Sequence, residues 1–251
     1  MADLPSVPEG RLVYAVGDIH GRSDLLTELL RKIEDDAASH VSATRRTLVF
    51  LGDYVDRGPD SRGVVEILSS GLPDGFDAIA LKGNHEWFLL DFLEHPKALP
   101  LWLYNGAAAT LASYGVPSSV HPQADSAPDV LREQFAAALP SSHRSFLASL
   151  EMTAVIGGYL FVHAGVRPGV PLDQQDPEDL LWIREPFLET RESFGHIVVH
   201  GHTPGTEPVV RKNRICIDTG ACMTGRLTAL RLFASERAFL TTSGDPADRR
   251  D

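Results

Sequence analysis

The sequence has few cysteines, fewer basic than acidic residues, and no long apolar run. Its two cysteines, Cys216 and Cys222, have neither zinc-finger nor disulfide-framework spacing, so we expect reduced thiols and a cytoplasmic protein. Residues 1–10 carry no apolar leader and no stretch approaches the length of a membrane span, so no membrane partner is expected. A formal net charge of −11, from 23 basic and 34 acidic residues, argues against nucleic acid as the main partner.

The overall composition is that of a globular protein. Of the 251 residues, 43% are hydrophobic and 23% are charged, which is near the average for folded proteins. This length favours one domain over residues 1–251, with a core from about 11 to 242 and a polar, frayed tail over 243–251. Short β-branched apolar runs alternate with segments of helical periodicity, which predicts an α/β fold. Around residues 87–150, leucine, alanine and aromatic residues punctuated by proline predict a helical insertion.

The most informative stretch runs from Gly52 to Gly58 and reads Gly-Asp-Tyr-Val-Asp-Arg-Gly. It follows residues 47–51, an apolar run typical of a buried strand. Ligands of open α/β sheets bind beyond the carboxyl ends of the strands, so Asp53 lies where a ligand would bind. Two carboxylates and a guanidinium are costly to bury without partners. A metal ion at Asp53 and a phosphate at Arg57 would provide them, although this stretch alone is equally compatible with a polar turn.

Other predicted strands end in the same way, in polar residues next to glycine. Asp18 and His20 follow strand 12–16 and are two residues apart, so in an extended stretch they project to the same side. A hard oxygen beside an imidazole nitrogen suits a first-row divalent metal. Further polar strand ends are Asn84-His85 after strand 76–81, His163 after a hairpin with Gly157-Gly158 at its turn, and His202 after strand 197–199. One such ending is easily structural, but their repetition predicts a shared site.

Five of these motifs, in order between residues 11 and 232, resemble the phosphoprotein phosphatase branch of the calcineurin-like metallophosphoesterases, of the bacterial and bacteriophage lambda type. The motifs are Gly17-Asp18-Ile19-His20-Gly21, Gly52 to Gly58, Gly83 to Glu86, His163-Ala164-Gly165 and Gly201-His202-Thr203. The resemblance implies a four-layer αββα sandwich with a dinuclear metal site at one edge. It also implies a phosphomonoesterase in which a metal-bridging hydroxide attacks phosphorus directly, a chemistry that two metals and arginines support.

The resemblance assigns roles to individual residues. One metal would be held by Asp18, His20 and Asp53, and the other by Asp53, Asn84, His163 and His202, so that Asp53 bridges the two ions. His85 matches the general acid, Asp56 the carboxylate that orients it, and Arg57 and Arg184 two phosphate-binding arginines. Mn²⁺ is the expected ion because it suits mixed oxygen and imidazole ligands, although Fe, Zn or Ni would bind the same set. His200 and Asp218 are expected to support the site rather than to bind metal.

Two substrate classes stay open, namely phosphoproteins and small phosphorylated metabolites. Relatives that hydrolyse diadenosine tetraphosphate typically replace the aspartate of Val-Asp-Arg-Gly, whereas Asp56 is present here. Phosphodiesterase branches usually carry Gly-His-X-His, whereas the last position here is Pro204. Both features favour a phosphoprotein or phosphopeptide substrate, with phosphoserine or phosphothreonine expected and phosphotyrosine left open. A catalytically silent protein of the same fold would have lost a ligand or the acid, and none is missing.

Overall fold

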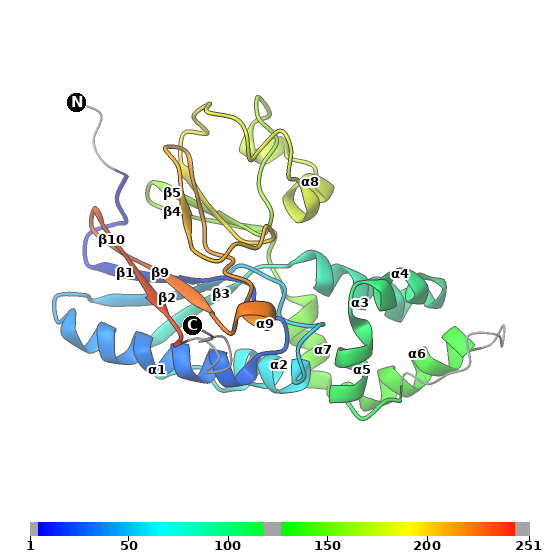
Figure 1. Cartoon of the computed structure of the whole chain (residues 1–251). Helices are drawn as coiled ribbons and strands as arrows, with labels where there is room; N and C mark the ends of the chain where they lie inside the picture. The colour runs from blue at the N-terminus through cyan, green and yellow to red at the C-terminus, as the bar shows by residue number, and fades with distance from the viewer. Residues whose placement is uncertain (1–4, 118–126, 244–251) are drawn as a thin grey trace, which may run out of the picture.

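In the computed structural model, which describes residues 5–117 and 127–243, two five-stranded sheets pack face to face (Figure 1). The first has the order β10-β9-β1-β2-β3 and the second β4-β5-β6-β8-β7. The strands of the first sheet are β1 (Arg11–Val16), β2 (Arg45–Phe50), β3 (Phe76–Ala80), β9 (Thr228–Phe233) and β10 (Glu236–Thr241). Those of the second are β4 (Thr153–Ile156), β5 (Tyr159–Val162), β6 (Ile197–His200), β7 (Val209–Val210) and β8 (Arg214–Cys216). Strands β1, β2 and β3 are parallel, and so are β5, β6 and β8, which brings their carboxyl ends to common edges.

Alternation along the strands builds the layers. In β1, Val13 and Ala15 belong to the core between the two sheets, whereas Leu12, Tyr14 and Val16 belong to the core under the helices. Strand β5 does the same, with Tyr159 and Phe161 facing the first sheet and Leu160 and Val162 facing outward. A strand with both faces buried reads as a nearly continuous apolar run, which is why the sequence predicts these strands well.

Helices cover the outer faces of both sheets, as the predicted αββα sandwich requires. Helices α1 (Ser23–Ser39) and α2 (Ser61–Ser70) lie beneath the first sheet, and α8 (Pro177–Trp182) with its neighbouring coil lies beside the second (Figure 1). The buried stripe of α1, from Leu25 to Ile33, has the helical spacing expected from the sequence. The fold prediction is therefore confirmed, although the outer layer over the second sheet is thin because α8 is short.

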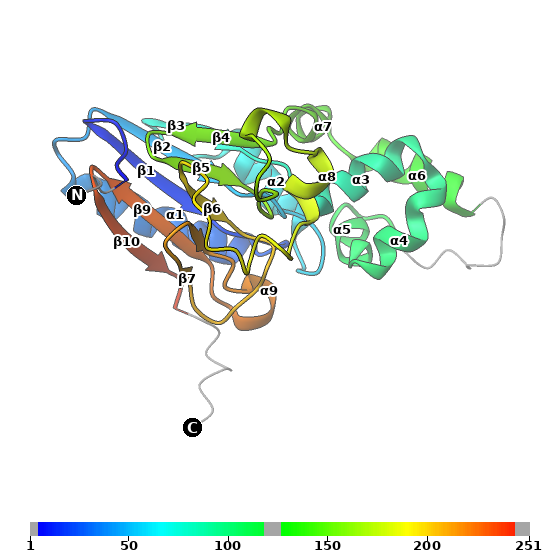
Figure 2. The same cartoon turned by 90° about the horizontal axis from the view of Figure 1, so that it is seen from above.

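The predicted helical insertion is also found, at one end of the sandwich (Figure 2). Its helices are α3 (Asn84–Glu94), the 3₁₀ turn η1 (Pro96–Ala98), α4 (Leu99–Tyr104), α5 (Ala107–Ser113), α6 (Ala127–Ala138) and α7 (Ser141–Ala148). Of the predicted frayed tail only Ser243 is described, and its backbone N–H donates to Glu28; residues 244–251 lie outside the described residues. The prediction of a single domain stays a prediction.

Two short elements complete the description, the 3₁₀ turn η2 (Leu172–Gln174) and helix α9 (Ala221–Thr224). Across residues 5–117 and 127–243, none of the helices is both long enough and apolar enough to cross a membrane.

Candidate metal centre and active site

The polar strand ends gather beyond the carboxyl ends of β1, β2, β3, β5 and β6, where the two sheets meet. A hollow of about 240 Å³ opens there. Its lining residues come from the loops after β2 and β6, the insertion, and α8 with the segment that follows it, and they are Asp53, Arg57, Asn84, Asn105, Trp182, Arg184, His202 and Pro204. Residues far apart in the sequence, among them Arg57 and Arg184, therefore face one space.

One side of the centre consists of hydrogen-bond acceptors that face one another. His163 Nδ1 donates to the carbonyl oxygen of Leu51 at 2.9 Å, so His163 Nε2 carries a lone pair. His163 Nε2 lies 2.9 Å from Oδ1 of Asn84 and 3.4 Å from Oδ1 of Asp53. His202 Nδ1 lies 3.0 Å from the same Asn84 oxygen. His163 Nε2 and the oxygens of Asn84 and Asp53 are acceptors without a proton between them and repel one another, and a divalent cation bound among them would remove that repulsion.

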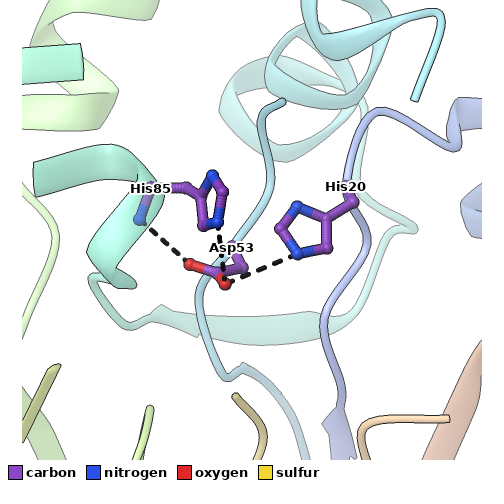
Figure 3. A group of neighbouring side chains, drawn as sticks. All are labelled: His20, Asp53 and His85. Carbon is purple, nitrogen blue, oxygen red and sulfur yellow. Dashed lines mark hydrogen bonds and ion pairs between the residues drawn. The ribbon is translucent and has the colours of Figure 1, made fainter. Parts of the chain in front are cut away.

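The other side of the centre is built around His20 and the second oxygen of Asp53. His20 Nδ1 donates to the carbonyl of Val55 at 2.8 Å, which directs Nε2 to within 3.5 Å of Oδ2 of Asp53. His85 Nε2 lies 3.9 Å from the same oxygen, and the three side chains converge (Figure 3). Asp53 thus presents Oδ1 to His163 and Oδ2 to His20, a geometry that fits the predicted bridging ligand.

The ionisation of these groups favours metal binding. Burial lowers the pKa of His163, and it lowers the pKa values of His20 and His202 to about 3, so all three imidazoles are neutral at pH 7. Burial alone would raise the pKa of Asp53, but His163, His85 and His20 outweigh it and lower the pKa. Neutral imidazoles and an ionised carboxylate are the forms that bind divalent metals.

Asp18 lies at the edge of this group. Its Oδ2 accepts the backbone N–H of His202 at 3.0 Å, whereas its buried Oδ1 has no hydrogen-bond partner. Burial, followed by the neighbouring Asp218 and Asp53, raises its pKa well above the usual range. A buried carboxylate oxygen without a donor is costly, and a cation is a partner that would fit it. Two groups of side chains, His20-Asp53-His85 and Asp53-His163-His202, could each hold a metal ion and share Asp53, whereas Asp18 and Asn84 as further ligands stay a prediction.

Beside the metal ligands, His85 and Asp56 form a buried pair. His85 Nδ1 donates to Oδ2 of Asp56 at 2.7 Å, and both side chains are fully buried. Burial would lower the pKa of His85, but Asp53 and the hydrogen bond to Asp56 outweigh it and raise the pKa. A histidine whose pKa is raised and whose Nδ1 is held by a carboxylate is suited to act as a general acid through Nε2.

The two predicted phosphate-binding arginines border the hollow. Arg57 Nη1 donates to Nε2 of His20 at 2.8 Å, and Nη2 donates to Nε2 of His85 at 3.0 Å, so both imidazole nitrogens are acceptors here. Arg184, two residues after the end of α8, lines the same hollow as Arg57. Two guanidinium groups at one small cavity are suited to bind the oxygens of a phosphate.

The backbone of the site is strained at several ligand positions. Of the described residues other than glycine, six have a positive φ, and five of these lie at the site with φ between +45° and +70°, namely His20, Asp53, Asp56, Arg57 and His202; the sixth is Ala234 in a turn elsewhere. Such conformations cost of the order of 1–3 kcal/mol each and persist only where the surroundings enforce them. Strain concentrated on one set of residues marks this edge as the functional one.

Glu86 is a supporting residue to which sequence reasoning gave no role. Its buried carboxylate accepts four backbone N–H groups, from Gly83, Asp53, Tyr54 and Val55, at 2.7–3.2 Å. It therefore connects the turn after β2 to the first turn of α3. A signal was present, because a glutamate at the third helical position after an N-cap is typical of a capping box.

His200 and Asp218 occupy supporting positions, as the sequence suggested. His200 packs against Phe187 with ring centroids 5.0 Å apart, and its Nε2 accepts from Arg214 at 3.3 Å. Asp218 Oδ1 accepts the backbone N–H of Gly220 at 2.9 Å. Of the other histidines, His143 contacts Tyr114 and Glu66, His95 contacts Asp91 and His40 contacts Asp36. The buried Nδ1 of His196 has no hydrogen-bond partner, and His121 lies outside the described residues.

Comparison with known proteins adds an independent line of support. The family model for calcineurin-like phosphoesterases matches residues 12–225. Serine/threonine-protein phosphatase 1 of Salmonella typhimurium is 30% identical over 227 residues, which cover 88% of this chain and 92% of that protein. Bis(5'-nucleosyl)-tetraphosphatase PrpE of Bacillus mycoides is 28% identical over 234 residues, which cover 86% of this chain and 88% of that protein. A crystal structure provisionally described as that of a diadenosine tetraphosphatase has a TM-score of 0.62 at 22% identity and covers 95% of this chain and 98% of its own.

The two-sheet fold and the acceptor-rich centre at its edge define a metallophosphoesterase architecture. The chain belongs to the calcineurin-like phosphoesterase family, whose model spans most of it. The resemblance to the phosphoprotein phosphatase branch is confirmed by these relatives, which include both a protein phosphatase and a dinucleotide tetraphosphatase.

Proposed function

We propose that the protein is a phosphomonoesterase that hydrolyses phosphoserine and phosphothreonine esters of proteins with two divalent ions. Asp18, His20 and Asp53 would hold one ion, and Asp53, Asn84, His163 and His202 the other. Mn²⁺ is the proposed ion, and the free thiols of Cys216 and Cys222 support the proposal of a reducing, cytoplasmic compartment. When bound, the ions supply charge neutralisation for the phosphoryl oxygens and an activated water.

The observation that carries this proposal is the buried pair of His85 and Asp56 beside Asp53. A serine or threonine alkoxide is a poor leaving group and needs a proton as the P–O bond breaks. In the proposed reaction Arg57 turns from His85 to the phosphate, whose oxygens it holds together with Arg184, and His85 is then protonated on Nε2 and gives that proton to the leaving oxygen. Water supplies the oxygen that joins phosphorus, and a water proton restores His85, so the products are the alcohol and inorganic phosphate.

Hydrolysis of diadenosine tetraphosphate is the second candidate, and the similarity to PrpE supports it. There the leaving group is a nucleotide phosphate oxygen, which departs with little need of a proton. A fully buried carboxylate that orients an acid would contribute little to that reaction. The His85–Asp56 pair therefore favours the alkoxide leaving group of a phosphoprotein.

The direct test compares turnover of phosphoseryl and phosphothreonyl peptides, a phosphotyrosyl peptide, para-nitrophenyl phosphate and diadenosine tetraphosphate, each with Mn²⁺, Fe²⁺, Zn²⁺ and Ni²⁺. We expect the phosphoseryl or phosphothreonyl peptides to give the highest kcat/KM. If diadenosine tetraphosphate exceeds every peptide, the second candidate replaces the first.

His85→Asn tests the assigned acid. We expect phosphopeptide turnover to fall by about 10²- to 10⁴-fold, the usual contribution of general acid catalysis. Turnover of para-nitrophenyl phosphate should fall much less, because its leaving group needs little protonation, and the metal content should stay normal. His95→Asn, at the exposed end of the same helix, is the matched control. Equal losses on both substrates together with a lost ion would make His85 a metal ligand, a role that its place 3.9 Å from Asp53 permits.

A further inference from the structure

The carboxylate of Asp56 is held by two side chains from the helical insertion. Trp102, in α4, donates its indole N–H to Oδ2 of Asp56 at 2.9 Å, and Thr110, in α5, donates its hydroxyl to Oδ1 at 2.6 Å. These residues lie 46 and 54 positions away along the chain, and all three side chains are fully buried. With the bond from His85, the side chain of Asp56 accepts three donors and is fully buried.

The hydroxyl of Thr110 also accepts a hydrogen bond from the backbone of Asp56. A carboxylate accepts, so the single hydroxyl proton of Thr110 points to Asp56 Oδ1. Its oxygen is then the acceptor for the backbone N–H of Asp56 at 2.8 Å and for the hydroxyl of Ser61 at 3.0 Å. Thr110 therefore contacts both the main chain and the side chain of Asp56, which has a φ of +70°, and Ser61 Oγ accepts the same backbone N–H at 3.0 Å.

The turn between α4 and α5 supports the next residue, Arg57. The carbonyl oxygen of Gly106 accepts the backbone N–H of Arg57 at 3.3 Å. A side chain at Gly106 would place its Cβ 3.0 Å from that nitrogen, and Gly106 itself has a φ of +108°. The insertion therefore contacts Asp56 through Trp102 of α4 and Thr110 of α5, and it contacts Arg57 through Gly106 in the turn between these helices.

We propose that Trp102 and Thr110 are positioning residues of the phosphatase reaction, which align His85 by fixing the carboxylate plane of Asp56. The inference rests on the proposed general-acid role of His85. Because Trp102 and His85 share one oxygen of Asp56, the indole determines the direction from which that oxygen receives the His85 N–H. That direction determines where the opposite ring nitrogen, Nε2, meets the leaving oxygen. A misplaced proton donor harms poor leaving groups more than good ones.

The test compares Trp102→Phe and Thr110→Val with wild type on a phosphoseryl peptide and on para-nitrophenyl phosphate. Phenylalanine keeps a ring against Phe92 and Phe135 but lacks the N–H, and valine keeps the shape of threonine without the hydroxyl. We expect each variant to lose about tenfold in kcat on the peptide, clearly less on para-nitrophenyl phosphate, with KM and metal content unchanged. Thr110→Ser, which retains the hydroxyl, should restore most of the peptide turnover.

Tyr114→Phe is the matched control, because it removes a buried hydroxyl of the insertion that bonds His143 and not Asp56. It should alter thermal stability without changing the ratio of the two activities. If Trp102→Phe and Thr110→Val lose both activities in equal proportion, they are packing residues and the inference is overturned. If they show no bias while His85→Asn does, the positioning role fails and the general acid stands. If His85→Asn itself shows no bias, the proposed acid is wrong and the inference falls with it.

Discussion

Asp53 shows how a single side chain can organise a dinuclear site. Its two oxygens face different sets of ligand atoms, Oδ1 toward His163 and Oδ2 toward His20. Its backbone φ of +53° turns the chain sharply after β2, and its N–H is held by Glu86. Burial would raise the pKa of its carboxylate, but the surrounding titratable histidines lower it. Removing its charge should therefore disturb both metal positions together.

Asp53→Asn should hold fewer than two ions and lose more than about 100-fold in phosphopeptide turnover, since even residues that only orient metal ligands contribute about 10- to 100-fold. Elemental analysis of the purified variant, together with kinetics at saturating Mn²⁺, measures both effects. Asp77→Asn is a suitable control, because Asp77 is an exposed residue of β3 paired with Arg45. Two tightly held ions and wild-type turnover in Asp53→Asn would contradict the bridging assignment.

At the scale of elements, Glu86 ties the first turn of α3 to the turn that carries Asp53. Its two oxygens each accept two backbone N–H groups, and the side chain is fully buried. Burial, followed by the charge of Asp53, raises its pKa to about 7. The residue does not face the metal ligands, but the relative placement of Asp53 and Asn84 depends on it.

Glu86→Gln should destabilise the fold by on the order of 1–3 kcal/mol, because an amide NH₂ replaces an oxygen that accepts two buried N–H groups. Metal affinity should fall as well, since the two turns that supply ligands are no longer tied together. Denaturant unfolding and metal titration measure the two effects. Glu94→Gln, on the exposed face of the same helix, should leave both unchanged. Unaltered stability in Glu86→Gln would show that the four N–H groups find other acceptors.

Local patterns predict the elements that carry the site, because the signals for them lie within a few residues. The hairpin at Gly157-Gly158 is found as β4 and β5, with Ile156 opposite Tyr159. The strands expected at 12–16, 47–51 and 76–81 are found as β1, β2 and β3, within one or two residues of those bounds. Strand β7 was not expected, because its two residues give no periodicity. A glycine within two residues of each polar strand end made it possible to predict the candidate site from the sequence.

Contacts between distant segments could not be predicted in the same way. Trp102 reads as one more apolar residue of a core helix, and it does pack against Phe92 and Phe135. Nothing in its neighbourhood indicates that its N–H reaches Asp56, 46 residues earlier. The same holds for Thr110. Such partners depend on how the insertion docks onto the sandwich, which periodicity and capping signals do not determine.

For the whole molecule, the net charge of −11 contrasts with the chemistry proposed for the site. An anionic phosphate ester must approach an acidic protein, so attraction has to be local. Arg57 and Arg184 at one hollow, together with bound divalent ions, would supply it. Electrostatics also affects stability, because several ionisable groups are buried with pKa values far from those of the unfolded chain.

His200 offers a measurable case of this linkage. Burial, followed by the charge of Arg214, lowers its pKa to about 3, against about 6.5 in an unfolded chain. Between these pH values the unfolded state binds a proton on His200 that the folded state does not bind. The free energy of unfolding therefore falls as the pH drops from about 6.5 toward 3. At pH 5 the loss from this one group is on the order of 2 kcal/mol. Asp218 acts in the opposite sense, because its pKa is raised to about 6, chiefly by burial.

We therefore expect the contribution of His200 to appear when the pH dependence of the free energy of unfolding is compared between wild type and His200→Gln, since other groups also titrate in the wild type. The free energy of unfolding, measured in guanidinium with metal chelated, should fall more in wild type than in His200→Gln between pH 7 and pH 5, by on the order of 2 kcal/mol. Glutamine can still donate to Gly201 and accept from Arg214 but does not titrate. His95→Gln, at an exposed position, should follow wild type. Parallel profiles for wild type and His200→Gln would mean that the folded protein accepts the proton on His200, and that the buried ring is not held neutral by its surroundings.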